Sequence, residues 1–147
     1  MSNKLKTHES VKIQKPEAGC FSDQYPHISF RYLTQNSRYN FDFIEKLDSS
    51  KKAIVSLLLL KRLEELSKVS WQELAANTKK HGLETLKRKQ LNFRGTDDNT
   101  EDSKVFILQF DTHLGSKKGR IIGFKDSPCS ALFVTGFDFD FSAYDHS

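Results

Sequence analysis

Cysteine is scarce in this chain, and it has no long apolar run. The two cysteines, Cys20 and Cys129, are too far apart for a CxxC motif or a zinc-binding spacing. Two isolated cysteines in a Lys-rich chain favour a reducing cytoplasm over a disulfide scaffold. The longest apolar run is Ala53–Leu60, whereas a membrane span needs about 20 residues. We therefore predict a cytoplasmic protein without a membrane partner.

Motifs for cofactor binding and nucleophilic catalysis are missing as well. The sequence contains no glycine-rich loop of the kind that holds phosphates, no GxSxG motif and no internal repeat. These absences count against most metabolic enzyme classes. We predict no cofactor and no bound metal.

Phenylalanine, in contrast, is abundant. The 147 residues include 12 Phe, and 37% of all residues are hydrophobic, which is enough for a real core. The length is typical of one domain. The first 24 residues contain four lysines and almost no apolar periodicity. We predict a flexible basic arm over residues 1–24 and a single domain over residues 25–147.

Charge is distributed unevenly along the chain. Residues 1–92 carry 17 Lys and Arg against 10 Asp and Glu, whereas residues 93–147 carry 6 against 9. A basic half joined to a slightly acidic half indicates a one-sided electrostatic surface, for which nucleic acid is the obvious anionic partner. The alternative is that the helices carry lysine only for solubility.

The middle of the chain has helical periodicity. Asp48 is an N-cap candidate for a helix over about Ser50–Val69, whose apolar residues cover more than half of its circumference and predict packing on two sides. Ser70 and Glu73 form a capping box that begins a second helix. Gly82 interrupts the pattern, and the leucines over residues 83–91 suggest a third, short helix.

Strand patterns flank the helices. Alternating apolar residues from His27 onward predict a first strand, and Lys104–Phe110, Arg120–Phe124 and Leu132–Phe137 predict three more. Consecutive strands with short connections pair antiparallel. We therefore predict an α+β two-layer sandwich: an N-terminal strand, two or three helices, then a three-stranded antiparallel meander at the C-terminus.

Four segments together resemble the RelE/ParE/HigB superfamily of small toxins: Trp71–Leu74, Gly82–Lys87, the GRIIGF run at Gly119–Phe124, and Leu132–Phe137. The resemblance covers about residues 70–146. It implies a metal-independent endoribonuclease of the mRNA-interferase type, or an RNA-binding relative. RNA or the ribosome and an antitoxin-like protein are the implied partners.

The resemblance also implies site residues. Arg120 matches the strand-opening arginine and Tyr144 the C-terminal tyrosine, while His146 is a candidate acid or base because its ordinary pKa lies near neutrality. Transfer of the phosphoryl group to the RNA 2′-hydroxyl needs a cation on the phosphate and a proton donor or acceptor beside it. Structural alternatives remain: an ion pair for Arg120, a packed ring for Tyr144 and a solvated chain end for His146.

Two basic clusters are candidate RNA contacts. They consist of Lys79, Lys80 and the adjoining His81, and of Lys87, Arg88 and Lys89. Placed on helices, the two clusters would line one basic strip along which phosphates bind. The RNA hypothesis further expects the Lys87–Lys89 edge to gather with Arg120 at one point. A solvated helix face is the alternative interpretation.

Acidic residues mark a departure from the family pattern. Asp138 and Asp140 stand where HigB-like members have lysines, and carboxylates beside an RNA site repel phosphate. The same pair, with Asp111 and His113 from a neighbouring strand, would alternatively suit Mg²⁺ or Mn²⁺ in a metal-dependent nuclease. A third hypothesis is a non-enzymatic protein-interaction module of the phage or plasmid accessory type.

Overall fold

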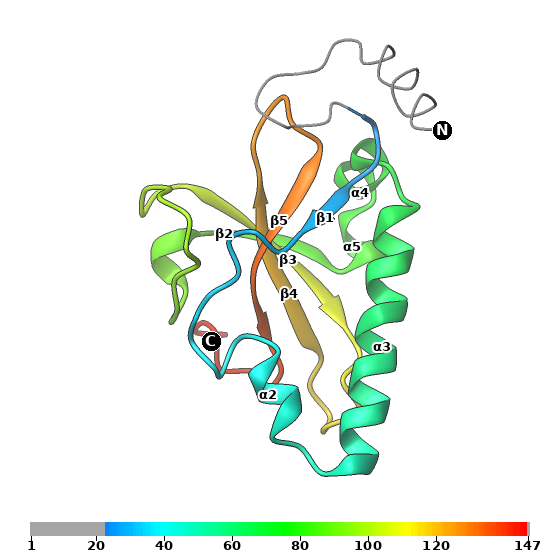
Figure 1. Ribbon diagram of the computed structural model, residues 1–147. Helices are drawn as coiled ribbons and strands as arrows, with labels where there is room; N and C mark the ends of the chain where they lie inside the picture. Colours follow the sequence, from blue (N-terminus) through cyan, green and yellow to red (C-terminus); the bar gives the residue numbers. More distant parts are fainter. Residues whose placement is uncertain (1–22, 147) are drawn as a thin grey trace, which may run out of the picture.

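A computed structural model describes residues 23–146. The arm predicted for residues 1–24 thus lies outside the described residues except for its last two positions. Figure 1 shows a twisted sheet with the long helix α3 (Ser49–Ser67) lying along it. The short helices α2 (Asp42–Glu45), α4 (Trp71–Ala76) and α5 (Thr78–His81) flank α3 in the chain. The α+β class is confirmed.

The sheet has five strands in the order β1-β5-β4-β3-β2. The strands are β1 (His27–Ser29), β2 (Leu83–Lys87), β3 (Lys104–Phe110), β4 (Gly119–Lys125) and β5 (Ala131–Asp138). The strands β2 to β5 pair antiparallel, whereas β1 pairs parallel to β5. The predicted three-stranded meander is therefore present as β3–β4–β5 but is extended by one strand on each side.

The prediction of a third helix over residues 83–91 is wrong, because Leu83–Lys87 form strand β2. Gly82 adopts the left-handed conformation (φ 64°) that ends α5, and the chain then runs as strand β2 along β3. Leu83 and Leu86 have helical spacing, but pairing with the apolar strand β3 satisfies the backbone hydrogen bonds in an extended conformation. Long-range strand pairing has overridden the local pattern.

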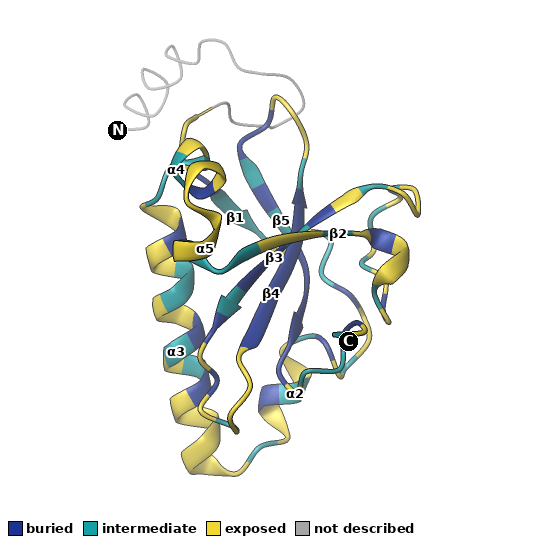
Figure 2. Cartoon of the chain, turned by 180° about the vertical axis from the view of Figure 1, so that it is seen from behind, coloured by how far each residue is buried: buried dark blue, intermediate teal, exposed yellow. Residues whose placement is uncertain are grey.

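Helix α3 begins where the sequence predicts. The side chain of its N-cap, Asp48, accepts a hydrogen bond from the backbone N–H of Lys51 at 3.0 Å. One side of α3 buries Val55, Leu59 and Leu66 against the sheet. The opposite side is exposed, so the prediction of packing on two sides is wrong for the single chain (Figure 2).

Two apolar clusters lie on opposite faces of the sheet. The first, between the sheet and α3, contains Leu108, Phe110, Ile121 and Phe137. The second contains Ile107, Ile122, Phe93 and Tyr144 and is covered by loops and the C-terminal segment instead of a helix. Residues that alternate along β3 and β4 therefore face opposite clusters, as strand geometry requires. The centre of the sheet, β4, is buried on both faces.

Cys129 is buried and disulfide-bonded, so the expectation of a reduced thiol at this position is wrong. Within residues 23–146, no helix combines the length and apolar character needed to cross a bilayer.

Candidate functional site

Arg120 lies on the second face of the sheet, in a row of polar side chains near one end of the strands. Its partners in the register are Gln109 on β3 and Asp138 on β5. Residues directly opposite each other on paired strands point to the same face. Arg120, Gln109 and Asp138 therefore form a polar row at the edge of an apolar face.

Arg120 and the C-terminal segment are joined by hydrogen bonds. Arg120 Nε donates to the Tyr144 hydroxyl oxygen at 3.0 Å, and a terminal nitrogen donates to the carbonyl of Lys118. The Tyr144 hydroxyl in turn donates to the Glu84 carboxylate on β2. Arg120 and Tyr144 are each only 7% exposed. We call Glu84, Arg120, Asp138, Tyr144 and His146 the Arg120 cluster.

Asp138 shapes the turn that returns the chain to this cluster. Its fully buried carboxylate accepts backbone hydrogen bonds from Ser142 at 2.9 Å and Ala143 at 3.1 Å. Between them, Phe141 adopts a left-handed conformation (φ 63°) that a bulky side chain rarely takes. The buried carboxylate thus holds a strained turn that presents Tyr144 to Arg120.

His146 lies against the same turn. Its ring stacks on Phe141 with centroids 3.5 Å apart and interplanar angle 13°, and it also contacts the Tyr144 ring. Its Nε2 atom is 3.9 Å from the Asp138 carboxylate, too far for a hydrogen bond, and has no hydrogen-bond partner in the described part of the chain. His146 is therefore packed as an aromatic ring and not frayed into solvent.

The surroundings of Tyr144 and His146 shift the pKa values of both side chains. Burial, reinforced by the hydrogen bond to Glu84 and opposed by Arg120, raises the pKa of Tyr144 to about 12. Burial and the nearby Arg120 charge lower the pKa of His146 below its ordinary value. At neutral pH, Tyr144 is a protonated donor to Glu84. The three candidate catalytic residues converge, but two of them are almost fully enclosed.

Stability should depend on Tyr144 at alkaline pH. The folded pKa of about 12 exceeds the ordinary value of 10.0, so the folded state holds the phenol proton more tightly than the unfolded state. This contribution is fully present below pH 10 and is lost as the pH rises toward 12. Urea unfolding at a series of pH values should show this loss in the wild type. Tyr144→Phe should flatten it, and an unchanged slope would contradict the assignment.

A basic pocket of about 290 Å³ lies beside the start of β2 and the end of β3. Its lining contains no carboxylate side chain and consists of Arg62, Lys79, Lys80, His81, Gly82, Gln109, Phe110 and Lys118. Among residues 23–146, no acidic group lies within 4.0 Å of the ammonium groups of Lys79, Lys80 or Lys118. We call this site the basic pocket.

Arg62 fixes the pocket to α3. Its guanidinium donates to the carbonyls of Gln109, at 2.8 Å, and His81, and also contacts Glu65. These bonds hold the end of α5 and the end of β3 at one place. Lys118, whose carbonyl accepts from Arg120, connects the pocket to the Arg120 cluster. The pocket lysines surround an arginine whose position these bonds fix, and this concentration of positive charge suits an anion.

The predicted RNA-contact residues separate into two groups. Lys79 and Lys80 line the basic pocket. Lys87 and Lys89 lie at the other end of β2, where both pair with Asp102, at 3.9 and 3.2 Å. Lys87 is opposite Lys104 on β3, whereas Arg120 is opposite Gln109, five residues or about 17 Å farther along that strand. The expected single basic strip, and its convergence with Arg120, are therefore wrong.

Arg88 is buried and bound to a neighbouring loop. It is 4% exposed and donates to the carbonyls of Asn99 at 2.8 Å and Asp97 at 3.0 Å. It also forms an ion pair with the buried Asp97 carboxylate. These contacts fasten the short 3-10 helix η2 (Arg88–Gln90) to the loop that precedes β3. Arg88 is thus enclosed and cannot contact a phosphate, contrary to its expected role in RNA binding.

The alternative metal site does not assemble. Asp138 binds backbone amides, while Asp140 pairs with Arg38 at 2.9 Å. Asp111 accepts from the backbone N–H of His113 in an exposed turn. In the described residues, no group of three or more His, Cys, Asp or Glu side chains is arranged to hold a metal ion.

Sequence reasoning missed three residues of these sites: Glu84, Arg62 and Lys118. Glu84 lies in the segment that was predicted to be helical, so its approach to Tyr144 depends on the strand pairing of β2. Arg62 and Lys118 meet Lys79 only through tertiary packing, and no local spacing connects them.

In the comparisons with known proteins, no family model, curated protein or solved structure matches the chain, so the toxin resemblance stays a prediction.

Proposed function

We propose that this protein binds RNA through its phosphate backbone and that the basic pocket is the principal contact. The observation that carries the proposal is a hollow with three lysines and an arginine in its lining and no carboxylate side chain. Lysine and arginine side chains that release counterions from phosphates supply most of the sequence-independent affinity for nucleic acid. The basic balance of residues 1–92 supports the same partner.

The toxin resemblance extends this proposal to RNA of the translation machinery, hence to a cytoplasmic protein that associates with mRNA or the ribosome. This localisation rests on the resemblance alone, because the disulfide at Cys129 overturns the argument from reduced cysteines. An antitoxin-like partner is implied by the resemblance alone. The basic pocket does not require such a partner.

A RelE-type, metal-independent endoribonuclease is the second candidate, favoured by the meeting of Arg120, Tyr144 and Glu84 from three parts of the chain. Glu84 is exposed, and its carboxylate accepts a hydrogen bond from the Tyr144 hydroxyl. In this mechanism Glu84 would be the general base for the RNA 2′-hydroxyl. Arg120 would neutralise the scissile phosphate. The enclosure of Arg120 argues for binding as the primary activity.

Replacing the pocket lysines tests RNA binding. The triple variant Lys79→Gln, Lys80→Gln, Lys118→Gln should bind a fluorescein-labelled single-stranded RNA on the order of 100-fold more weakly at about 0.1 M salt. The slope of log K against log salt should fall in magnitude by about 2, because three phosphate contacts are lost. Fluorescence anisotropy titrations at several salt concentrations give both quantities. DNA of the same sequence is the second ligand.

A matched variant controls for net charge. Lys46→Gln, Lys61→Gln, Lys68→Gln removes three exposed lysines that are outside the pocket lining. It should leave most of the affinity and the salt slope in place. Equal losses in both triple variants would contradict a pocket-centred site. No RNA binding by the wild type would favour the protein-interaction module.

Cleavage is tested separately with labelled mRNA, with and without ribosomes and EDTA. Endoribonuclease activity predicts EDTA-insensitive cleavage by the wild type that is lost in both Glu84→Gln and Tyr144→Phe. RNA binding without cleavage under any of these conditions removes the enzyme hypothesis and retains the binding proposal.

A further inference from the structure

Two aromatic rings and two lysines meet near the beginning of β3. Trp71, the first residue of α4, and Phe106 on β3 have ring centroids 5.7 Å apart. The Lys125 ammonium is 5.5 Å from the centre of the Trp71 ring, and the Lys104 ammonium is 5.3 Å from the centre of the Phe106 ring. Each lysine is thus within cation–π distance of one ring. We call these four residues the Trp71 platform.

The fold holds the two rings in place. Lys104 and Phe106 are two residues apart on β3, so their side chains point to the same face of the sheet. The indole Nε1 of Trp71 donates a hydrogen bond to the carbonyl of Ser130 at 2.9 Å, which fixes the orientation of the ring. Trp71 and Phe106 are both partly exposed. The platform therefore presents ordered aromatic surface to solvent.

A hollow of about 430 Å³ adjoins the platform. Lys104, Phe106 and Lys125 line it, and its other lining residues are uncharged. In the part of the chain that the structure describes, no acidic group lies within 4.0 Å of the Lys104 or Lys125 ammonium. The volume is within the range of about 300–1,000 Å³ that is typical of small-ligand sites. Rings beside unpaired cations suit a ligand that combines a flat ring with a negative charge.

We propose that the Trp71 platform stacks an unpaired base of single-stranded RNA, while Lys104 and Lys125 bind the flanking phosphates. This inference rests on the proposed RNA binding and names the form of RNA that is bound. Stacking on a side chain needs an open base face, which a single strand offers and a duplex hides. A base on Trp71 turns Lys125 away from the ring, and the flexible stem of this lysine lets its ammonium reach a phosphate.

The platform and the basic pocket are close enough for one RNA strand to contact both. Phe106 lines the hollow beside the platform, and Gln109 lines the basic pocket. These two residues are three positions, or about 10 Å, apart along β3. Proteins that bind single strands typically cover at least about four nucleotides. One strand can therefore place a phosphate in the basic pocket and a base on the platform.

The fluorescence of Trp71 tests the stacking directly, because Trp71 is the only tryptophan of the chain. Titrating unlabelled single-stranded RNA into the full chain should quench this fluorescence, with the same midpoint as the anisotropy titration. Duplex RNA of the same sequence offers phosphates but hides its base faces, so it should bind without comparable quenching. Single-strand binding without quenching, or equal quenching by the duplex, would overturn the platform.

An aromatic substitution measures the contribution of stacking. Phe106→Leu keeps an apolar side chain and should weaken single-strand binding about tenfold, while duplex binding stays unchanged. Phe41→Leu is the matched control, because Phe41 is 41% exposed and lies outside the platform. It should change neither affinity. Equal single-strand affinities of the two variants would count against stacking at Phe106.

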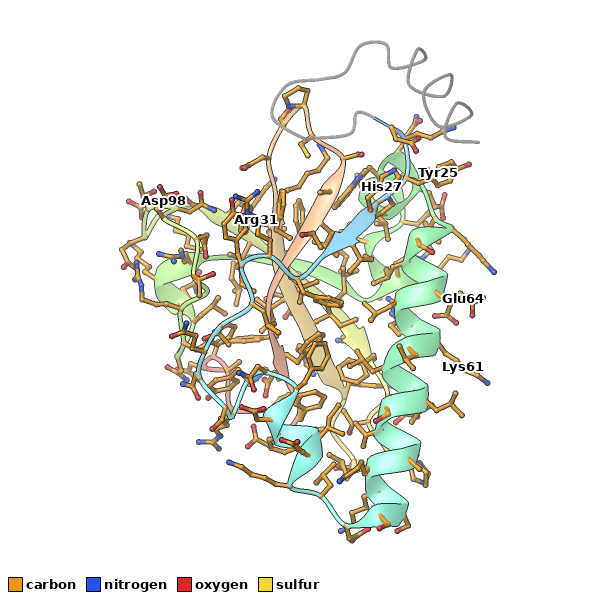
Figure 3. The ribbon with its side chains drawn as sticks, viewed as in Figure 1. Tyr25, His27, Arg31, Lys61, Glu64 and Asp98 are labelled. Atoms are coloured by element: carbon orange, nitrogen blue, oxygen red, sulfur yellow. The ribbon has the colours of Figure 1, made fainter. Side chains whose placement is uncertain are left out.

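A lysine pair measures the phosphate contacts. Lys104→Gln with Lys125→Gln should reduce the salt slope for single strands by about 1.4, because two phosphate contacts are lost. Lys61→Gln with Lys68→Gln is the control for net charge, and Figure 3 shows Lys61 projecting from the outer side of α3. Circular dichroism checks that each variant is folded. The lysine pair and the wild-type fluorescence keep the test valid even if Phe106→Leu does not fold.

The outcomes separate this inference from the proposed function. RNA binding that depends on the lysines of the basic pocket, but not on Phe106, would overturn the platform and retain the proposed function. Full affinity and full Trp71 quenching in the triple variant of Lys79, Lys80 and Lys118 would retain the platform and remove the basic pocket as the principal contact. A wild type that binds no RNA would overturn both.

Discussion

Replacing Arg120 by alanine should destabilise the fold by about 3 kcal/mol, the range seen when one partner of a buried polar network is removed. Arg120 is 7% exposed and ties β4 to the C-terminal segment through Tyr144 and to the following loop through Lys118. Its loss leaves the Tyr144 hydroxyl and the Lys118 carbonyl without their donor. Urea unfolding, followed by the fluorescence of Trp71, gives the free energy of unfolding.

Two related variants show whether the effect comes from the buried charges. Arg120→Lys keeps the charge but not the fork of donors, so it should recover part of the loss. Combining Arg120→Met with Asp138→Asn removes both charges and should cost less than the two single changes together. A loss below about 0.5 kcal/mol for Arg120→Ala would place Arg120 outside the stabilising network.

Replacing Arg88 by alanine should also cost about 3 kcal/mol, while RNA affinity of the folded protein stays nearly unchanged. Arg88 is enclosed with Asp97, and its removal leaves a buried carboxylate and two loop carbonyls without their donor. Urea unfolding and anisotropy titration of the same preparation separate stability from binding.

Lys89 is the natural control for Arg88, since it is the next residue in the sequence and its ammonium group is on the surface. Its ion pair with Asp102 is exposed, so Lys89→Ala should change stability by less than about 0.5 kcal/mol. If Arg88→Ala instead weakened RNA binding and left stability unchanged, the structural assignment of Arg88 would be wrong.

Much of the fold follows from local patterns. Strand β3 occupies the predicted Lys104–Phe110, because a run that is apolar on both faces belongs between two other strands of a sheet. The N-cap residues Asp48 and Ser70 mark the starts of α3 and α4. The Ser70 hydroxyl oxygen accepts a hydrogen bond from the backbone N–H of Glu73 at 3.0 Å. Caps and periodicity act within a few residues, so the sequence shows them directly.

The candidate site was only partly predictable. Arg120, Tyr144 and His146 lie together in the fold, but their enclosure and their link to Glu84 do not follow from the sequence. Lys79 and Lys80 line the basic pocket, whereas Lys87 and Lys89 are turned toward Asp102 at the far end of β2. A strand rises more than twice as far per residue as a helix, so the second basic cluster lies farther from the first than helical spacing predicts.

The sequence by itself determined the α+β class, the long helix and the three central strands, because periodicity and capping are local properties of the chain. Only the tertiary structure decided that residues 83–87 are a strand, that Glu84 meets Tyr144, and that one leucine row of α3 stays exposed. Each of these outcomes depends on which segments lie beside each other after folding. Which segments become neighbours is decided by hydrogen bonds between distant strands and by the limited area of the sheet. Neither can be seen in a short stretch of residues.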